Sequence, residues 1–234
     1  NIEFQKITPE WLNGFKKYLL SEVSQITAWH YYTNIKYALN RAVKEMIIQS
    51  NPCAFVDNIK KPETQRSYLT IQEVRKLNRN VCGNKDVKDA FIFSCFTGLR
   101  YSDVLNLKWS NIKKDKIEFI QKKTGGVEYL PIAEEAKKIL KKKAKSKSNE
   151  SVFHLPKKPV IWEHIQNWKK AAEIDKKVSF HTARHTFATL SLTMGTDLYT
   201  VSKLLGHKSI STTQVYAKII DKKKVQAINK LPSL

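Results

Sequence analysis

The chain has 234 residues, of which 41% are hydrophobic and 10% aromatic, so it can bury a core and is not a disordered tail. Its 42 Lys and Arg outnumber 21 Asp and Glu, and the formal net charge of +21 opposes a compact fold unless a polyanion is the natural partner. Nucleic acid is the first candidate and an anionic membrane surface the second, although no apolar stretch approaches the length that spans a bilayer.

The first sixty residues predict a small bundle of helices. Thr8, followed by Pro9 and Glu10, is a favourable helix start, because Pro suits the first turn and an acid suits the positive end of the helix dipole. Apolar residues then recur every three or four positions and predict a long helix that Asn51–Pro52 ends. They are Trp29, Tyr32, Ile35, Leu39, Ala42 and Met46.

A polar run over residues 60–67 predicts a linker, so we expect two domains, residues 1–62 and residues 67–234. The positive charge is divided unevenly between them. Nine basic and six acidic groups lie before residue 67, whereas 33 basic and 15 acidic groups follow. The second domain is therefore expected to provide most of the attraction to a polyanion.

The second domain begins with a predicted capping box, in which the side chains of Thr70 and Glu73 satisfy backbone donors reciprocally. A helix is expected to end near Gly98, and residues 116–132 predict a β-hairpin around a Gly-Gly loop. Further helices are expected over residues 133–145, 161–174, 180–194, 197–205 and 211–220.

Residues 137–147 hold seven lysines, and apolar side chains on the opposite side predict an amphipathic helix with a basic outer face. That face is either simply solvated or a phosphate contact that is independent of base sequence. The three cysteines, Cys53, Cys82 and Cys95, lie among apolar neighbours without a pairwise framework, so we expect buried, reduced thiols of a cytosolic protein.

Phosphodiester cleavage without a metal needs a particular set of side chains. Fixed cations must meet the extra negative charge on the attacked phosphate, and the bidentate guanidinium of Arg fits it best. A positioned acid must protonate the leaving 5′ oxygen, and a side-chain nucleophile conserves the bond energy for resealing. This chemistry therefore requires two arginines, one or two histidines, a lysine, and a Ser or Tyr.

Three clusters hold such residues. Arg100 lies in the segment TGLRYSD (97–103), at a tight junction where Ser102 is predicted to cap the next helix. Taken alone, this position is explained better by a structural arginine that bonds helix carbonyls. His181 and Arg184 are three apart in HTARH and share a helix face. A zinc site with His185 is disfavoured, because the Glu of the HExxH motif is missing and an arginine would lie beside the ion.

The third cluster is the segment LLGHKSISTTQVY (204–216). Gly206 is predicted to end one helix, and a capping box from Ser211 to Gln214 would place Tyr216 about a turn and a half into a new helix. His207 lies in the connecting turn. Taken singly, a helix tyrosine is usually a core-edge residue and a turn histidine a surface group.

The combination and order of these motifs resemble the phage-integrase family of tyrosine recombinases. The matching segments are TGLRYSD (97–103), QKKTGG (121–126), HTARHTFAT (181–189) and LLGHKSISTTQVYAK (204–218). The resemblance covers essentially the whole chain, because residues 1–62 resemble the helical core-binding domain of the family. It implies a mainly helical fold with a small antiparallel β-sheet, in which a basic clamp of helical bundle and α+β catalytic domain surrounds DNA.

The resemblance also implies a role for each matching residue. Arg100 and Arg184 would clamp the scissile phosphate, and Tyr216 would attack phosphorus to give a 3′-phosphotyrosyl link and a free 5′ hydroxyl. His181 would assist proton transfer, and His207 would bond a phosphate oxygen or orient the tyrosine.

Lys123 would protonate the 5′ leaving oxygen, although its neighbour Lys122 is an open alternative. Asp103 matches an acidic position that anchors the active-site histidines or arginines, and His185 is expected to be structural. Further candidate DNA contacts are Lys122, Lys141, Lys142 and Lys208.

The implied function is integration or excision of a bacterial mobile element by site-specific recombination. The implied partners are double-stranded attachment or core sites and a Holliday junction, bound by a homotetramer that is monomeric without DNA. The tail after Tyr216 would dock on a neighbouring subunit or pack on its own domain. No metal, ATP or membrane is required. A chromosome-dimer resolvase or a type IB topoisomerase shares this chemistry, and a DNA-binding module without catalysis leaves the catalytic set unexplained.

We expect a bacterial cytoplasmic protein associated with the nucleoid, because no signal-peptide core follows the first residue. That residue is Asn1 rather than Met, and nothing in residues 1–60 resembles the arm-binding domain that many integrases carry. The start at Asn1 suggests a piece cut from a longer protein and fits removal of such an N-terminal domain, although the sequence leaves that removal open.

Overall fold

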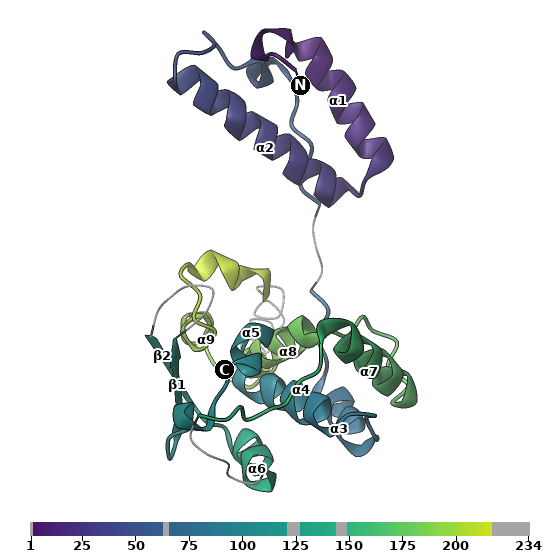
Figure 1. The fold of residues 1–234 in the computed structure, drawn as a ribbon, viewed down its shortest axis with the longest axis vertical. Coiled ribbons are helices and arrows are strands. Elements are labelled where there is room, and N and C mark those ends of the chain that lie inside the picture. The colour runs from purple at the N-terminus through teal and green to yellow at the C-terminus, as the bar shows by residue number, and fades with distance from the viewer. Residues whose placement is uncertain (1, 63–65, 121–126, 144–148, 217–234) are drawn as a thin grey trace, which may run out of the picture. The chain divides into compact units, whose positions relative to one another are not determined.

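The computed structural model describes residues 2–62, 66–120, 127–143 and 149–216. The chain forms two compact units, residues 1–65 and 66–234 (Figure 1). Its described part is mainly helical with one two-stranded antiparallel sheet, which confirms the predicted fold class.

The first unit is a helical hairpin with short flanking turns. Helices α1 (Pro9–Glu22) and α2 (Gln25–Lys44) pack against each other, and the 3₁₀ turns η1 (Phe4–Lys6) and η2 (Pro52–Phe55) flank them. The hydroxyl of Thr8 accepts a hydrogen bond from the amide of Trp11 at 3.2 Å, which confirms the predicted start of the first helix.

The end of α2 corrects two predictions. Met46 is 91% exposed with a φ of 56°, so it does not belong to the apolar face of the helix. The amides of Met46 and Ile47 donate to the carbonyls of Val43 and Ala42, which is a Schellman motif and ends the helix at Lys44. Asn51 therefore does not end this helix but instead caps η2, where its side chain accepts from the Cys53 amide at 2.9 Å.

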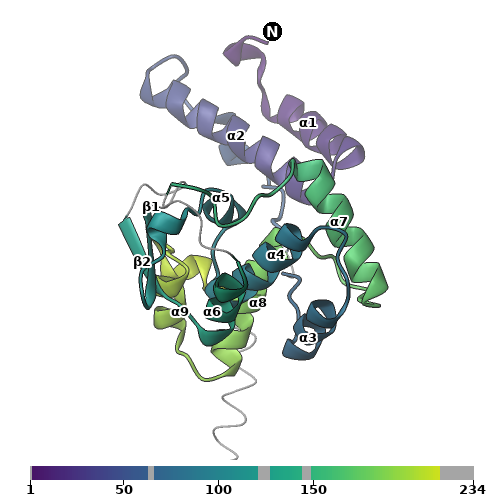
Figure 2. The ribbon, with the colours of Figure 1, turned by 60° about the horizontal axis from the view of Figure 1, so that its bottom comes forward.

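The second unit is built around a buried central helix, α4 (Lys85–Thr97). Helices α3 (Ile71–Arg79), α6 (Glu134–Lys142), α7 (Lys158–Ala171) and α8 (Phe180–Thr193) all pack against it (Figure 2). The predicted capping box at the start of α3 is confirmed, with the Thr70 amide 2.6 Å from the Glu73 carboxylate and the Glu73 amide 3.2 Å from the Thr70 hydroxyl.

The β-hairpin follows α5 (Tyr101–Leu105) and η3 (Trp109–Asn111) in the chain. Strands β1 (Lys116–Ile120) and β2 (Val127–Pro131) are antiparallel, and Ile117 lies directly opposite Leu130 in the register. Both of these side chains are buried in the core, which fixes the face that the hairpin turns inward. The strands confirm the predicted hairpin, and its loop lies outside the described residues.

The last segments carry the main correction to the predicted elements. Helices α8 and α9 (Leu198–Leu204) match the expected ranges, but the helix expected over residues 211–220 is absent from its described part. Residues 210–216 instead form two tight turns, η4 (Ile210–Thr212) and η5 (Gln214–Tyr216). The cap is Ser209 rather than Ser211, and amides bond to carbonyls three residues back, as in a 3₁₀ helix.

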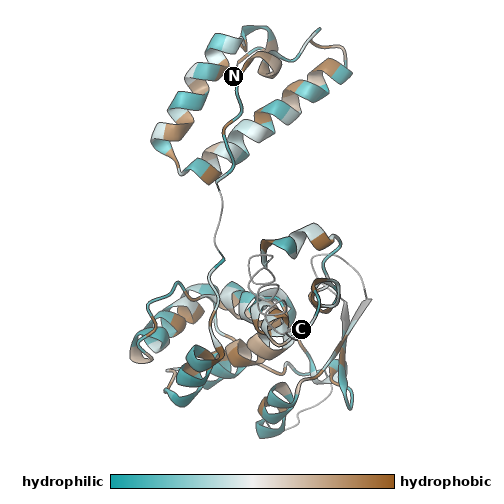
Figure 3. Cartoon of the chain, turned by 180° about the vertical axis from the view of Figure 1, so that it is seen from behind, coloured by the Kyte–Doolittle hydropathy of each residue, from teal (hydrophilic) through white to brown (hydrophobic). Residues whose placement is uncertain are grey.

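Hydrophobic residues gather on the helix faces that pack within each unit (Figure 3). Phe91 of α4 makes edge-on ring contacts with Trp168 of α7 and Phe180 of α8, at centroid distances of 5.6 and 5.8 Å. The three cysteines are buried and free, as predicted. Among the described residues, no helix is long and apolar enough to cross a membrane.

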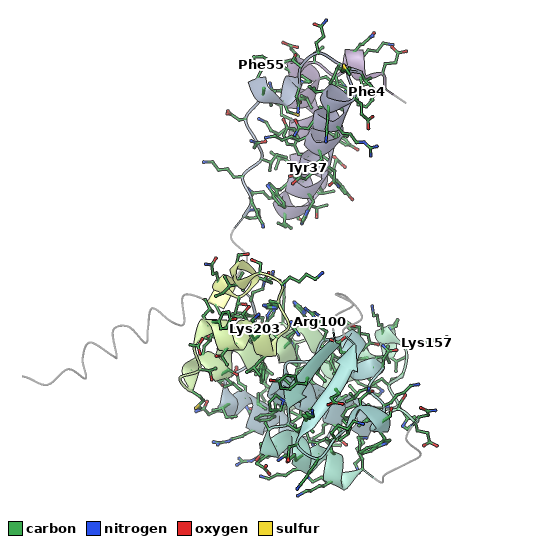
Figure 4. The ribbon with its side chains drawn as sticks, turned by 90° about the vertical axis from the view of Figure 1, so that its left-hand side faces the viewer. Phe4, Tyr37, Phe55, Arg100, Lys157 and Lys203 are labelled. Carbon is green, nitrogen blue, oxygen red and sulfur yellow. The ribbon has the colours of Figure 1, made fainter. Side chains whose placement is uncertain are left out.

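This core makes a first prediction. Phe91→Ala is expected to destabilise the second unit by about 3–5 kcal/mol, because it removes a fully buried ring and leaves a cavity. Hydrogen exchange measured by mass spectrometry would show the loss in peptides of α4 and α8. The control is Phe55→Ala in the first unit, a ring that is 75% exposed (Figure 4), which should change stability by no more than about 0.5 kcal/mol. Equal effects of the two changes would contradict the assignment of the core.

Candidate active site

Arg184 lies at the centre of the candidate site. It is on α8, is only 5% exposed, and donates to the carbonyl of Gly98 at 2.7 Å and to that of Leu205 at 2.6 Å. These two carbonyls belong to the ends of α4 and α9. A single buried guanidinium therefore joins three helices and uses the carbonyls that a helix end leaves without intrahelical partners.

Gly98 is the residue that lets α4 end against α8. Its φ is +69°, in the left-handed region that side chains other than glycine rarely adopt. A Cβ atom added here would lie 2.5 Å from a ring carbon of Phe187 on α8. The glycine that the sequence predicted as a helix end is thus also required by the close packing that brings its carbonyl to Arg184.

Arg100 follows two residues later and caps the start of α5. Its guanidinium is 3.5 Å from the carbonyl of Gly206 and 4.0 Å from the carboxylate of Asp103. Arg100 and Arg184 thus bond to consecutive carbonyls, those of Gly206 and Leu205. The side chains of the two arginines converge on one place, the turn after α9.

The two positive charges also act on each other. Burial and then the charge of Arg100 lower the pKa of Arg184 to about 10, which leaves it protonated at neutral pH. Two guanidinium groups so close together repel each other, so a bound anion would relieve an existing repulsion as well as form new hydrogen bonds.

Asp103 contacts Arg100 and acts electrostatically on Arg184. Its carboxylate is buried and accepts a hydrogen bond from the Arg100 amide at 3.3 Å, while its charge also raises the pKa of Arg184. The residue at the N-cap position of α5 is therefore Arg100, whose amide Asp103 bonds, and not Ser102, the predicted cap. An acid three residues into the helix satisfies the first free amide directly, which leaves the serine hydroxyl without that task.

Tyr216 lies in η5 and is 5% exposed, packed against Ala188, Leu192, Val201 and Leu205. Its hydroxyl makes a close hydrogen bond with Nδ1 of His185. Burial raises the pKa of Tyr216 to about 12, although the positive charges of Arg184 and Arg66 oppose the shift. The phenol is therefore neutral at physiological pH and lies within the electrostatic field of a candidate phosphate-binding arginine.

His185 is only 7% exposed, which agrees with an interior position, but it contacts the tyrosine hydroxyl and is more than a packing residue. Burial, followed by the charges of nearby groups, lowers the pKa of His185 to about 3. His181 is exposed one turn earlier on α8, and the two imidazole rings meet edge to face with centroids 4.3 Å apart.

His207 supports the turn that carries Tyr216. Its Nδ1 lies 2.7 Å from the hydroxyl of the buried Thr213, whose carbonyl in turn accepts the Tyr216 amide at 3.0 Å. Gly206 before it has a φ of 59° and ends α9 as predicted, with the His207 amide bonded to the Ser202 carbonyl at 3.0 Å.

The predicted lysines fall into two groups. Lys122 and Lys123 lie outside the described residues. The other three candidates are exposed: Lys141 and Lys142 in the last turn of α6, and Lys208 directly after His207. None of these three is brought into the cluster by a contact that the structure records.

Arg66 is the site residue that the sequence analysis missed. Its positive charge lowers the pKa of both Tyr216 and His185. The residues that follow it run along the start of α8, because the Ser67 hydroxyl bonds the Lys177 carbonyl and the Leu69 amide bonds the Thr186 hydroxyl, both at 2.9 Å. Arginine is scarce, with six in the chain, and this scarcity is the sequence feature that could have indicated Arg66 as a site residue.

The second unit thus brings together two guanidinium groups, a phenol and three imidazoles from segments far apart in the sequence. Figure 4 labels Arg100 in this unit. Cationic donors that converge beside a side-chain hydroxyl can bind an anionic ester and direct a nucleophile at it. That is the class of site that a covalent phosphoryl-transfer enzyme requires.

Comparison with known proteins agrees with this class. A model of the phage integrase family matches residues 67–223, and a model of the phage integrase SAM-like domain matches residues 1–61. The chain belongs to the phage integrase family.

A relative in Caldanaerobacter subterraneus subsp. tengcongensis, named tyrosine recombinase XerC, is 31% identical over 211 residues. This match covers 81% of the chain and 58% of that recombinase, so the chain spans little more than half of its relative.

Solved structures show the same fold. A lambda integrase fragment, in a dimer bound to a core site, matches with a TM-score of 0.76 and 22% identity over 92% of this chain and 81% of that one. A lambda integrase tetramer bound to a Holliday junction matches with a TM-score of 0.72 and 24% identity over 87% of this chain and 65% of that one.

The two carbonyl contacts of Arg184 make a second prediction. Arg184→Lys should lower the free energy of unfolding of the second unit by about 1.5–3 kcal/mol, because one ammonium group cannot reach both carbonyls. Urea unfolding followed by circular dichroism measures the loss. Arg41→Lys is the control, since its ion pair with Glu45 is exposed and should contribute less than about 1 kcal/mol. An Arg184→Lys protein as stable as the control would contradict the anchoring role.

His185 makes a third prediction, on pH. In the unfolded chain its imidazole takes up a proton below pH 6.5, whereas in the folded protein it stays neutral down to about pH 3. The unfolded state therefore binds more protons between these values, and stability present above pH 6.5 is lost as the pH falls. Urea unfolding at several pH values should show a smaller acid loss for His185→Asn than for the wild type. Parallel curves would contradict a neutral buried imidazole.

Proposed function

We propose that this protein is a site-specific DNA recombinase that cuts and rejoins strands through a 3′-phosphotyrosyl intermediate. The observation that supports it most is the convergence of Arg100 and Arg184 on neighbouring carbonyls of the turn after α9, with the Tyr216 phenol in the field of Arg184. Membership of the phage integrase family supports the same reaction.

In the cleavage step, Arg100 and Arg184 hold the non-bridging oxygens of the scissile phosphate. The charge on these oxygens grows as the phosphorus is attacked, so fixed guanidinium donors stabilise the transition state more than the bound DNA. The Tyr216 oxygen bonds to phosphorus, and the bond from phosphorus to the 5′ oxygen breaks. Asp103 orients Arg100, and His207 holds the turn of Tyr216 through Thr213.

The leaving 5′ oxygen takes a proton from Lys123, with Lys122 as the neighbouring candidate. Rejoining is the reverse reaction, in which a 5′ hydroxyl attacks the phosphotyrosine and releases the phenol. The phosphodiester energy is kept in the covalent link, so neither ATP nor a metal is part of the proposed reaction.

The two units divide the work on DNA. Residues 1–62 bind the duplex of a core site, and residues 67–234 hold the catalytic groups and most of the positive charge. Lys141, Lys142 and Lys208 are exposed and contact phosphates without reading bases. The matched SAM-like domain over residues 1–61 supports this division.

The proposed assembly is a homotetramer on two duplexes, which exchanges strands through a Holliday junction. Residues after Tyr216 dock on a neighbouring subunit, and without DNA the protein is a monomer. The matched lambda integrase complexes, a dimer on a core site and a tetramer on a junction, support this assembly. The proposed setting is the bacterial cytoplasm, at the nucleoid, where the protein integrates or excises a mobile element.

The name of the relative favours a second candidate function. A XerC-type tyrosine recombinase matches 81% of this chain, so a resolvase of chromosome dimers would use the same site. The two functions differ in the DNA that is cut: the ends of a mobile element, or a fixed chromosomal site. The sequence of the DNA that the protein holds in its covalent intermediate would distinguish these two functions.

The fourth prediction concerns the covalent intermediate. Incubation with a library of nicked duplexes that have randomised central sequences should yield a protein–DNA adduct, because the short fragment with the free 5′ hydroxyl diffuses away and prevents rejoining. Denaturing gels would detect the adduct, and sequencing would identify the DNA. Tyr216→Phe should form no adduct while still binding the recovered duplex, since it lacks the attacking oxygen.

Tyr199→Phe is the matched control, because this tyrosine is in the same unit but 61% exposed, and its adduct should equal that of the wild type. An adduct that persists in Tyr216→Phe would show that another residue attacks. A wild type that captures no duplex at all would favour the DNA-binding module without catalysis.

A further inference from the structure

His185 is the group that touches the reacting atom of Tyr216. Its Nδ1 makes a close hydrogen bond with the tyrosine hydroxyl, and the two rings meet with centroids 5.7 Å apart. Both residues are almost completely buried. The contact joins α8 to η5 across 31 positions of sequence, so it is a feature of the folded site and not of local chain geometry.

The two groups share this hydrogen bond as neutral partners. Burial raises the pKa of Tyr216 to about 12, and burial followed by nearby charges lowers the pKa of His185 to about 3, so both are neutral at pH 7. The tautomer of the imidazole then sets the direction of the bond. The proposal below assigns the ring proton to Nε2, so that Nδ1 accepts from the phenol.

Burial is the largest cause of the low pKa of His185, and titratable and charged neighbours add to it. These neighbours are His181 and Arg184 on α8, Arg66 before α3, and His207 in the turn after α9. The facing group from η5 is Tyr216 itself.

We propose that His185 is a catalytic residue of the recombinase, the acceptor of the Tyr216 proton during cleavage. The inference rests on the proposed function and goes beyond it, since it assigns the nucleophile's proton to a residue outside the six motif positions. In this step the proton moves from the tyrosine oxygen to Nδ1 of His185, and the phenolate oxygen bonds to phosphorus. The bond to the 5′ oxygen then breaks, and that oxygen takes its proton from the separate lysine acid.

In the proposed step, the phosphate of the bound DNA makes His185 a stronger base and so activates its contact with Tyr216. After burial, guanidinium charge is one of the causes that oppose protonation of His185, and a bound phosphodiester neutralises the part that Arg184 contributes. Binding of DNA between the arginines thus raises the basicity of His185 where and when the nucleophile is needed. Without DNA the tyrosine stays a neutral, buried phenol, so no reactive phenolate is exposed to solvent.

His181 lies next to His185 at the start of α8, where it is exposed, and the two rings meet edge to face with centroids 4.3 Å apart. In rejoining, His185 returns the proton to the departing phenol, as reversal of the step requires.

The test compares His185→Asn with the wild type on the captured duplex. Asparagine places an acceptor oxygen near the position of Nδ1 and can hold the phenol, but it cannot take up a proton. Single-turnover adduct formation at pH 7 should fall by about 10²–10⁴-fold, the usual contribution of a positioned base. Above pH 7 the variant's rate should rise about tenfold per pH unit, as solvent deprotonates the phenol, while the wild-type rate stays level.

His154→Asn is the control and should keep the wild-type rate and pH profile, because that side chain is 73% exposed and pairs with Asp86. A His185→Asn profile parallel to the wild type, or an unchanged rate, would overturn proton acceptance. Tyr216→Phe, which forms no adduct, shows that the measured rate belongs to Tyr216. If the wild type itself captures no duplex, it is the proposed function that fails.

A second measurement uses the wild-type protein alone, without DNA and without a substituted variant. Long-range ¹H–¹⁵N spectra of histidine-labelled protein report which ring nitrogen carries the proton. His185 is expected to be neutral at pH 7 with its proton on Nε2 and Nδ1 free to accept. A proton on Nδ1, or a charged imidazolium, would overturn the proposal whatever the adduct assays give.

Discussion

The site depends on one buried cation. A guanidinium removed from water costs several kcal/mol, and it is tolerated in a protein only where hydrogen bonds replace its hydration. Arg184 obtains them from the carbonyls of Gly98 and Leu205, which are available because α4 and α9 end there. One requirement, the hydrogen bonding of this buried guanidinium, therefore explains several features. They are the ends of α4 and α9, the left-handed Gly98, and its close packing with Phe187. Arg100 reaches the next carbonyl of the same turn, which makes the place a concentration of positive charge.

The same charge explains the resting state of the nucleophile. Tyr216 lies in an apolar cluster, where a phenolate is disfavoured, and it is paired with an imidazole that burial, and then the surrounding charges, keep neutral. A neutral pair is stable and unreactive. In the proposed reaction, the anionic phosphate supplies the missing negative charge, so that binding of DNA and activation of the tyrosine are one electrostatic event. The same positive charge then both favours an anionic substrate and keeps the nucleophile neutral until that substrate binds.

Local signals in the sequence predicted what short-range chemistry determines. The Thr70–Glu73 capping box, the helix end at Gly206 and the β-hairpin over residues 116–132 follow from hydrogen-bond capping and from the period of strands. The order of Arg100, Arg184 and Tyr216 identified the family. Tertiary contacts could not be predicted in this way. Two serines compete for the cap before Tyr216, and the chain uses Ser209, which replaces the expected helix by 3₁₀ turns. The positions of His185 and Arg66 beside the tyrosine depend on helix packing, which no linear motif encodes.

The central claim is that two arginines and a tyrosine from distant segments meet at one phosphorus atom. A crystal structure of the protein with its captured DNA, in which orthovanadate bridges the cut strand ends, tests it most directly. Vanadium adopts the five-coordinate geometry of the attacked phosphorus. The account predicts a bond from vanadium to the Tyr216 oxygen, with Arg100 and Arg184 donating to the equatorial oxygens and His185 next to the phenol. Vanadium bonded to another side chain, or the two guanidinium groups directed to different anions, would contradict it.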